Sequence, residues 1–236
     1  MISVILKRKR ICLKYRGENV REFIQGMYQK PHFWKRMLFC FLAVCIMGFG
    51  VSWLNLIHLG TDPYSVMNLA IAERIHMSYG NWLVIFNTVL FVIVIVKDHS
   101  KIGFGTLFNM ICVGYACDFM TWLRQRLWPQ LTLESMSLGL RLVLMVVMLA
   151  MFILAVAVYM SVDLGTAPYD AMPFIIADAK EQFSFRVVRM IWDCAVTVIG
   201  FAIGGVVGIV TIIMAFAIGP VAAWVSRHIQ RFFEEK

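Results

Sequence analysis

Six apolar segments run through this chain and strongly limit what it can fold into. They cover residues 37–57, 82–96, 103–123, 138–162, 187–203 and 206–225. At 1.5 Å per residue, a helix of about 20 residues crosses the roughly 30 Å hydrocarbon core of a bilayer. With 61% apolar and only 15% charged residues, the composition predicts an all-α, polytopic helical membrane protein and excludes a soluble enzyme.

The excess positive charge lies at one end of the chain. Residues 1–36 hold ten Lys or Arg against two Glu, whereas residues 37–236 hold twelve charged residues of each sign. A basic segment beside a hydrophobic span is normally kept in the cytoplasm, where it meets anionic lipid. We therefore predict a basic cytoplasmic tail over residues 1–36 that contacts the lipid bilayer, and we do not expect nucleic acid as a partner.

Cysteine and histidine give no sign of a metal or cofactor. The six cysteines form no CxxC pair, and the five histidines show neither HExxH nor another helical pairing. We therefore expect no disulfide framework, no metal site and no cofactor.

Two polar breaks, residues 59–81 and 163–186, interrupt the apolar pattern. Each has a Gly followed three residues later by a Pro, a chain break that suits the start of a helix. About ten apolar residues follow, which cover only about 15 Å of the bilayer. We expect each break to begin a short re-entrant or interfacial helix.

The two breaks are copies of each other. At an offset of 105 residues, eight of the fourteen positions in 59–72 are identical to those in 164–177. The shared residues in the first copy are Leu59, Gly60, Thr61, Pro63, Tyr64, Met67, Ile71 and Ala72. The offset also matches Gly103, Thr106 and Gly114 with Gly208, Thr211 and Gly219, and a one-residue slip brings Asn87 onto Asp193. This predicts two homologous modules, 37–126 and 138–231, joined by a linker at 127–137.

The number of crossings decides how the modules are related. Three spans and one short helix per module give six spans and inverted copies, whereas four spans per module give eight spans and parallel copies. The distribution of Lys and Arg does not separate these models, and both place the two termini in the cytoplasm. We favour six spans because the short helices cover too little of the bilayer.

The motifs resemble those of a known family. Gly60-Thr61-Asp62-Pro63-Tyr64 is followed by Gly103-Phe104-Gly105-Thr106, and Gly165-Thr166-Ala167-Pro168-Tyr169-Asp170 repeats the first motif. The pattern resembles the YczE/YyaS/YitT group of bacterial integral membrane proteins, although that family usually has Trp in place of Tyr64 and Tyr169. The resemblance implies a multi-pass protein of the bacterial inner (plasma) membrane, in a group sometimes regarded as transporter-like.

The paired breaks form the candidate substrate site. Unwound backbone survives in a membrane only when it is buried in protein or lines a cavity, and helix N-termini there attract polar groups. The alternative is that the breaks are turns at the interface, with their tyrosines in the aromatic belt. The candidate residues are Gly60, Thr61, Asp62, Pro63, Tyr64, Gly165, Thr166, Pro168, Tyr169, Asp170 and Asp193.

Acidic residues at membrane depth are costly and need a role. Asp193 follows Arg189 by four residues, which predicts a helical ion pair. Asp62 and Asp170 lie where they can cap the short helices. Asp118 lies near the end of its apolar segment and can either reach the interface or serve a site. A relay that uses these carboxylates is the functional alternative.

These patterns favour a small transporter or exporter-like carrier with a site for a small polar or amphipathic solute between the modules. The alternative is a non-catalytic membrane scaffold or accessory subunit. An enzyme is not expected, because the chain has no GxSxG, HExxH or P-loop motif. The oligomeric state stays open.

Overall fold

The computed structural model describes residues 31–179 and 184–234, and this part of the chain is helical without strands, as predicted. The helices are α3 (Phe33–Ile57), α4 (Pro63–Arg74), α5 (Tyr79–Asp98), the 3₁₀ turn η1 (His99–Lys101), α6 (Phe104–Leu127), α7 (Leu138–Ser161), α8 (Pro168–Ala179), α9 (Phe185–Ile203) and α10 (Ile209–Glu234). The basic tail over residues 1–30 lies outside the described residues.

Three of these helices, α3, α5 and α7, are long and apolar enough to cross a membrane, and α10 contributes a shorter apolar stretch, Ile209–Ile218. Each of the six predicted apolar segments falls largely within one helix. The second and fifth segments, which are short in sequence, lie in helices of 20 and 19 residues. The protein is therefore a helical membrane protein, with three of the six predicted spans meeting the length and apolarity of a crossing.

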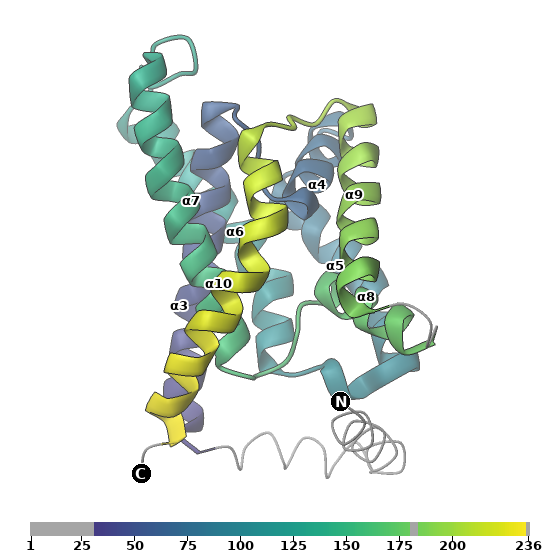
Figure 1. The fold of residues 1–236 in the computed structure, drawn as a ribbon. Coiled ribbons are helices and arrows are strands. Elements are labelled where there is room, and N and C mark those ends of the chain that lie inside the picture. The colour runs from purple at the N-terminus through teal and green to yellow at the C-terminus, as the bar shows by residue number, and fades with distance from the viewer. Residues whose placement is uncertain (1–30, 180–183, 235–236) are drawn as a thin grey trace.

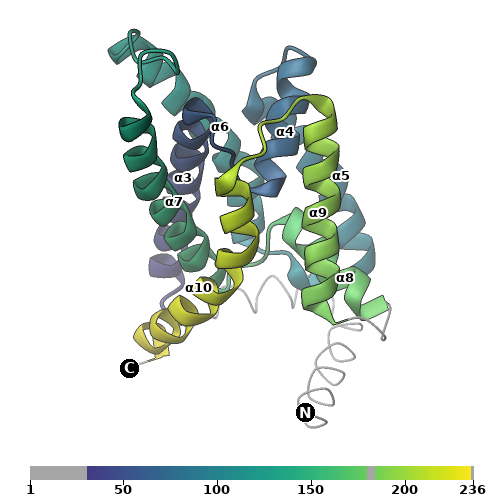
Figure 2. The ribbon, with the colours of Figure 1, turned by 45° about the horizontal axis from the view of Figure 1, so that its top comes forward.

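The helices form one bundle whose long members alternate in direction (Figures 1 and 2). α3 begins and α10 ends at the same end of the bundle, and α7 runs antiparallel to α3. The short helices α4 and α8 lie toward opposite ends, with α4 near the end where α9 is followed by α10 and α8 near the end where α9 begins.

The core is built around α3, which packs against both α6 and α7. Val44, Val51, Leu54 and Ile57 of α3 are completely buried. Gly48 lets α3 pack closely against α6, because a Cβ at this position would clash with the backbone of α6. Small residues let helix backbones approach closely in membranes, where van der Waals packing replaces the hydrophobic effect between helices.

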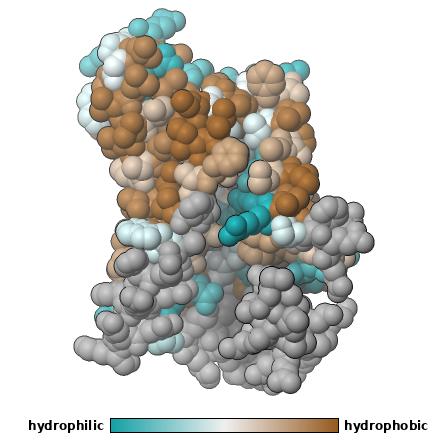
Figure 3. Space-filling model, viewed as in Figure 1, coloured by the Kyte–Doolittle hydropathy of each residue, from teal (hydrophilic) through white to brown (hydrophobic). Residues whose placement is uncertain are grey.

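The outer surface is apolar, as expected of a protein surrounded by lipid. Large apolar side chains such as Val96, Val143, Val198 and Phe201 are well exposed. Figure 3 shows this apolar surface on one face of the molecule, broken by a hydrophilic patch between α10 and α9. Polar groups therefore reach the surface on this side of the bundle.

Candidate functional site

The two breaks have the same backbone conformation. His58 and Asp163, 105 residues apart, both adopt the left-handed region, with φ of 52° and 53°. Gly60 and Gly165 follow with φ of 94° and 106°. A residue with a Cβ rarely adopts these angles, so the two glycines allow the chain to leave one helix and begin the next within a few residues.

Each break packs against the start of a long helix in the other half of the chain. The first break meets α10, where the Val210 amide donates to the Leu59 carbonyl over 3.1 Å. The second break meets α6, where the Gly105 amide donates to the Leu164 carbonyl over 2.7 Å. The two hydrogen bonds are equivalent under the repeat, because Leu59 matches Leu164 and Gly105 matches Val210 at the offset of 105 residues. In each bond, one half supplies the donor and the other half supplies the acceptor.

The close approach leaves no room for a side chain at either glycine. A Cβ on Gly60 would lie 2.5 Å from Thr211 Oγ1, and one on Gly165 would lie 2.7 Å from Thr106 Oγ1. Thr106 also donates its hydroxyl to the Thr166 carbonyl over 2.9 Å. The glycine of each motif therefore allows its break to fit closely onto the helix start of the other half.

Asp62 caps α4, as predicted, because its Oδ2 accepts a hydrogen bond from the Ser65 amide at 3.0 Å. Pro63 follows as the first residue of the helix, where its missing N–H costs nothing. The Asp62 side chain is buried, and its Oδ1 has no hydrogen-bond partner. Ser65 in turn accepts from the Tyr79 hydroxyl.

The two breaks meet through their tyrosines. The rings of Tyr64 and Tyr169 contact each other, with centroids 4.6 Å apart and planes inclined by 46°. Tyr64 donates its hydroxyl to Asn87 Oδ1 over 2.9 Å, and Tyr169 donates to Asp193 Oδ1 over 2.6 Å. The alignment of Asn87 with Asp193 thus corresponds to equivalent contacts, although one acceptor is neutral and the other is a carboxylate.

Arg189 links the second short helix to α9. Its Nε donates to Asp193 Oδ2 over 2.9 Å, which confirms the predicted ion pair, and its Nη1 donates to Asp170 Oδ1 over 2.6 Å. The guanidinium also lies over the Tyr169 ring, 5.4 Å from its centroid. Asp170 stands in the first turn of α8, as predicted, and its carboxylate binds this arginine of the neighbouring helix.

A row of aromatic rings extends from the tyrosine pair into both halves. Phe86 lies 6.1 Å from Tyr64 between centroids and 5.9 Å from Trp82, and on the other side Trp192 lies 5.8 Å from Tyr169. The row joins α5, α4, α8 and α9. Sequence reasoning missed these flanking rings, because aromatic residues in an apolar helix carry no distinguishing pattern.

Two arginines outside the predicted site also make equivalent contacts, each with a residue of the other half. Arg36, at the start of α3, donates from Nη1 to the Val162 carbonyl after α7 over 2.9 Å. Arg141, in the first turn of α7, donates from Nε and Nη2 to the Ile57 carbonyl at the end of α3 over 3.0 and 2.7 Å. Arg36 matches Arg141, and Ile57 matches Val162, at the offset of 105 residues. The sequence therefore contains this signal, although the predicted site does not include the two arginines.

Asp118 has a structural contact. Its Oδ2 accepts from the Gly80 amide over 2.8 Å, in the first turn of α5. A carboxylate is favoured there because the first amides of a helix are unpaired and the helix dipole is positive. Its position therefore supports the start of α5.

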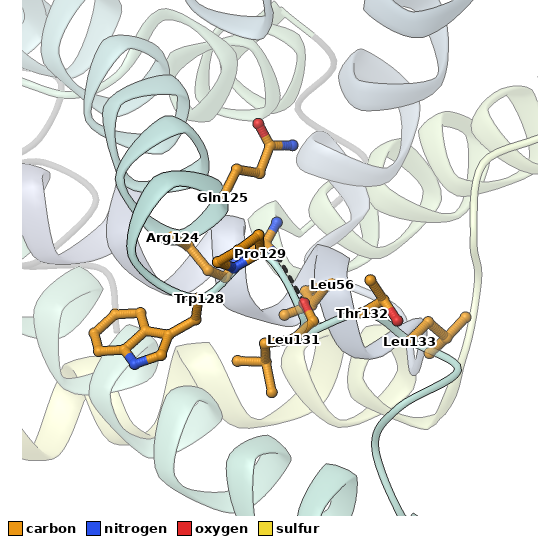
Figure 4. Close-up of a pocket in the computed structure, with 8 residues that line it drawn as sticks. All are labelled: Leu56, Arg124, Gln125, Trp128, Pro129, Leu131, Thr132 and Leu133. Carbon is orange, nitrogen blue, oxygen red and sulfur yellow. Dashed lines mark hydrogen bonds between the residues drawn. The ribbon is translucent and has the colours of Figure 1, made fainter.

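A surface hollow of about 450 Å³ lies elsewhere, at the end of α6 and in the linker that follows (Figure 4). Arg124 lies within it and donates to the Leu131 carbonyl. Its lining residues are Leu56, Arg124, Gln125, Trp128, Pro129, Leu131, Thr132 and Leu133. None of them belongs to the predicted site.

The described residues bring Tyr64 and Tyr169 of the two breaks into contact, beside the polar cluster around Arg189. Gly60 and Gly165 do not meet, because each packs against a long helix of the other half. Within residues 31–179 and 184–234, no three His, Cys, Asp or Glu side chains gather as a metal site. The available groups are two tyrosine hydroxyls, three carboxylates, one guanidinium and an amide. They can bind a solute by hydrogen bonds, charge and ring stacking.

These features define an integral membrane protein with an all-helical fold. A family model described as "Family of unknown function (DUF6198)" matches residues 34–227, so the chain belongs to this family. It is 27% identical over 198 residues to an uncharacterized protein of Haemophilus influenzae, covering 84% of this chain and 86% of that protein.

Two relatives come from Bacillus subtilis. The uncharacterized membrane protein YczE is 26% identical over 188 residues, which cover 78% of this chain and 82% of YczE. The uncharacterized protein YyaS is 22% identical over 144 residues, which cover 60% and 68% of the two chains. The predicted resemblance to the YczE/YyaS group is confirmed. No solved structure matches this chain.

Proposed function

We propose that this protein is a small secondary carrier of the bacterial plasma membrane, with a solute site where Tyr64 and Tyr169 meet between two inverted modules. The modules are residues 37–126 and 138–231, joined by the linker 127–137, and each supplies three crossings and one re-entrant helix. The observation that carries this proposal is the contact between the two tyrosines, each held by an equivalent partner from its own half.

The exchanged contacts support the inverted repeat. Arg36 and Arg141 each hold the end of the other's helix, and Leu59 and Leu164 each accept from the helix start of the other half. Contacts that map onto one another when the halves are exchanged are those of a twofold relation. A twofold axis in the membrane plane also agrees with α4 and α8 lying toward opposite ends (Figure 2).

The chemistry at the tyrosine pair supports a carrier over a scaffold. Buried polar groups at membrane depth are costly and are usually retained for a substrate or ion path. Here the breaks place carboxylates and hydroxyls at the contact between the halves, where rocking of one module against the other would open the site to alternate sides. The Pro-Tyr positions recur in both halves and bring the two tyrosines into contact, as a site shared by the modules requires.

A ligand screen tests the proposal. The purified full-length protein would be heated in detergent with a few hundred metabolites, lipids and drugs, alongside a Tyr64→Ala/Tyr169→Ala double variant. A ligand at one hundred times its dissociation constant stabilises the folded state by about 2.7 kcal/mol. The matched control is Tyr115→Ala, because Tyr115 is exposed and bonds to Asn81 away from the tyrosine pair.

The carrier is supported if a ligand stabilises the wild type and Tyr115→Ala but not the double variant. It is contradicted if stabilising ligands act equally on all three proteins, which would place binding elsewhere. If no compound stabilises a folded wild-type sample, the scaffold or accessory subunit becomes the better function, and a protein partner should be sought.

A further inference from the structure

The two halves differ in charge at equivalent positions around the tyrosine pair. Tyr169 has Asp193 as its partner and Asp170 beside it, whereas Tyr64 has Asn87 and Ser65 at the matching positions. Arg189 matches an apolar residue of α5 under the same alignment. All the charge of this matched set therefore lies in the second half.

Arg189 occupies a site that is suited to a cation. Asp170 and Asp193 hold its guanidinium from two different helices, and the Tyr169 ring lies beneath it. Carboxylates and an aromatic face together are what a buried cation needs for stabilisation. The two carboxylates and one guanidinium leave this cluster with a net charge of minus one.

The same cluster is open to its surroundings. Arg189 keeps 27% of its side-chain surface exposed and Asp170 keeps 23%. The neighbouring rings of Tyr169, Tyr64 and Trp192 supply an apolar wall. A solute that suits these surroundings is amphipathic as well as charged.

We infer that the site formed by Tyr169, Asp170 and Asp193 binds an amphipathic monocation, and that Arg189 is a tethered cation that fills this site until the solute displaces it. This inference rests on the proposed carrier function and names the substrate class of its site. In the closed arrangement the guanidinium neutralises the carboxylates. The arriving cation takes over the Asp193 carboxylate and the Tyr169 face, and the arginine swings toward its exposed side.

The test is direct binding of tetraphenylphosphonium to the purified full-length protein, measured by equilibrium dialysis. Its anionic counterpart, tetraphenylborate, has nearly the same size and shape and serves as the charge control. Arg189→Gln removes the competing cation and should tighten tetraphenylphosphonium binding by about tenfold. Arg186→Gln, which removes an exposed arginine from the same helix, should leave it unchanged.

A second variant covers the case in which Arg189→Gln fails to fold. Asp193→Asn installs the side chain that the first half already has at Asn87, which still accepts from a tyrosine hydroxyl. It should weaken tetraphenylphosphonium binding by about tenfold. Asp178→Asn, at an exposed position of α8, should not weaken it.

The outcomes separate this inference from the carrier proposal. Tighter binding in Arg189→Gln together with weaker binding in Asp193→Asn and unchanged binding in Asp178→Asn supports the cation site. If Arg189→Gln does not fold, weaker binding in Asp193→Asn with unchanged binding in Asp178→Asn supports it. Equal binding of the two probe ions, or no effect of Asp193→Asn, overturns it. If neither ion binds while a neutral or anionic compound from the ligand screen does, the cation site is wrong and the carrier stands.

Discussion

Tyr64 and Tyr169 make matching contacts with acceptors of different charge. The Tyr169 hydroxyl donates to a carboxylate that Arg189 also binds, whereas the Tyr64 hydroxyl donates to a neutral amide oxygen. Hydrogen bonds to charged groups are shorter and stronger than those between neutral groups. The donor–acceptor distances, 2.6 Å for Tyr169 and 2.9 Å for Tyr64, follow this order.

This difference predicts unequal effects of removing each hydroxyl. Tyr169→Phe should destabilise the fold by about 1.5 to 3 kcal/mol and Tyr64→Phe by about 1 kcal/mol. Thermal unfolding in detergent would measure both, with Tyr115→Phe as the control because its bond to Asn81 is exposed. A larger loss in Tyr64→Phe than in Tyr169→Phe would contradict the assigned charges.

Replacing a glycine by alanine should destabilise the protein at one position and stabilise it at another. Gly60→Ala should destabilise the protein by about 1 to 3 kcal/mol, because its positive φ and the nearby Thr211 leave no place for a methyl group. Gly139→Ala should stabilise it by about 0.5 to 1 kcal/mol, because Gly139 lies in α7 with open space around it. Unfolding midpoints of the two variants would decide, and a stabilising Gly60→Ala would refute the described geometry of the break.

At the scale of elements, the ends of α3 and α7 are held by arginines from one another. A helix leaves its last carbonyl groups unpaired, and a cation near them also interacts favourably with the negative end of the helix dipole. Arg36 and Arg141 meet both needs, since each donates to a carbonyl at the end of the partner helix. The two antiparallel helices are therefore joined at both ends.

Removing either arginine should loosen one end of this helix pair. Arg141→Met keeps most of the side-chain volume and should cost about 1.5 to 3 kcal/mol, the range for hydrogen bonds to charged groups. Arg126→Met, on an exposed position of α6, is the control and should have little effect. Amide hydrogen exchange should rise at the end of α3 in Arg141→Met, and exchange that rises only in α7 would show that the arginine acts elsewhere.

Short-range sequence patterns predicted contacts within a helix better than contacts between helices. The Asp62 cap and the Arg189–Asp193 pair depend on residues three or four positions apart and were predicted, because helical geometry fixes such contacts. The Arg189–Asp170 pair joins different helices, so sequence spacing carries no information about it. The contact between Tyr64 and Tyr169 also joins different helices, and it was predicted from the repeat of the two breaks and not from helical spacing. The offset of 105 residues named the matching positions, but only the fold shows that the halves exchange their contacts.

At the scale of the whole molecule, the proposed inverted repeat fixes which loops share a side of the membrane. The end of α4 and the linker after α6 lie at one end of the bundle, whereas the end of α8 lies at the other with the start of α3 and the end of α10 (Figures 1 and 2). Because Lys35 and Arg36 lie at the start of α3 and the basic residues 1–30 precede them, we predict that this second end faces the cytoplasm.

Labelling of introduced cysteines in intact cells tests this arrangement. In a chain whose six native cysteines have been replaced, Met77→Cys and Glu134→Cys should react with a membrane-impermeant maleimide from outside, because both positions are exposed at the outer end. Asp178→Cys, exposed at the end of α8, should react only after the membrane is permeabilised. A parallel repeat would place the equivalent ends of α4 and α8 on the same side, so labelling of Met77→Cys and Asp178→Cys from one side would exclude the inverted modules and with them the twofold site between the tyrosines.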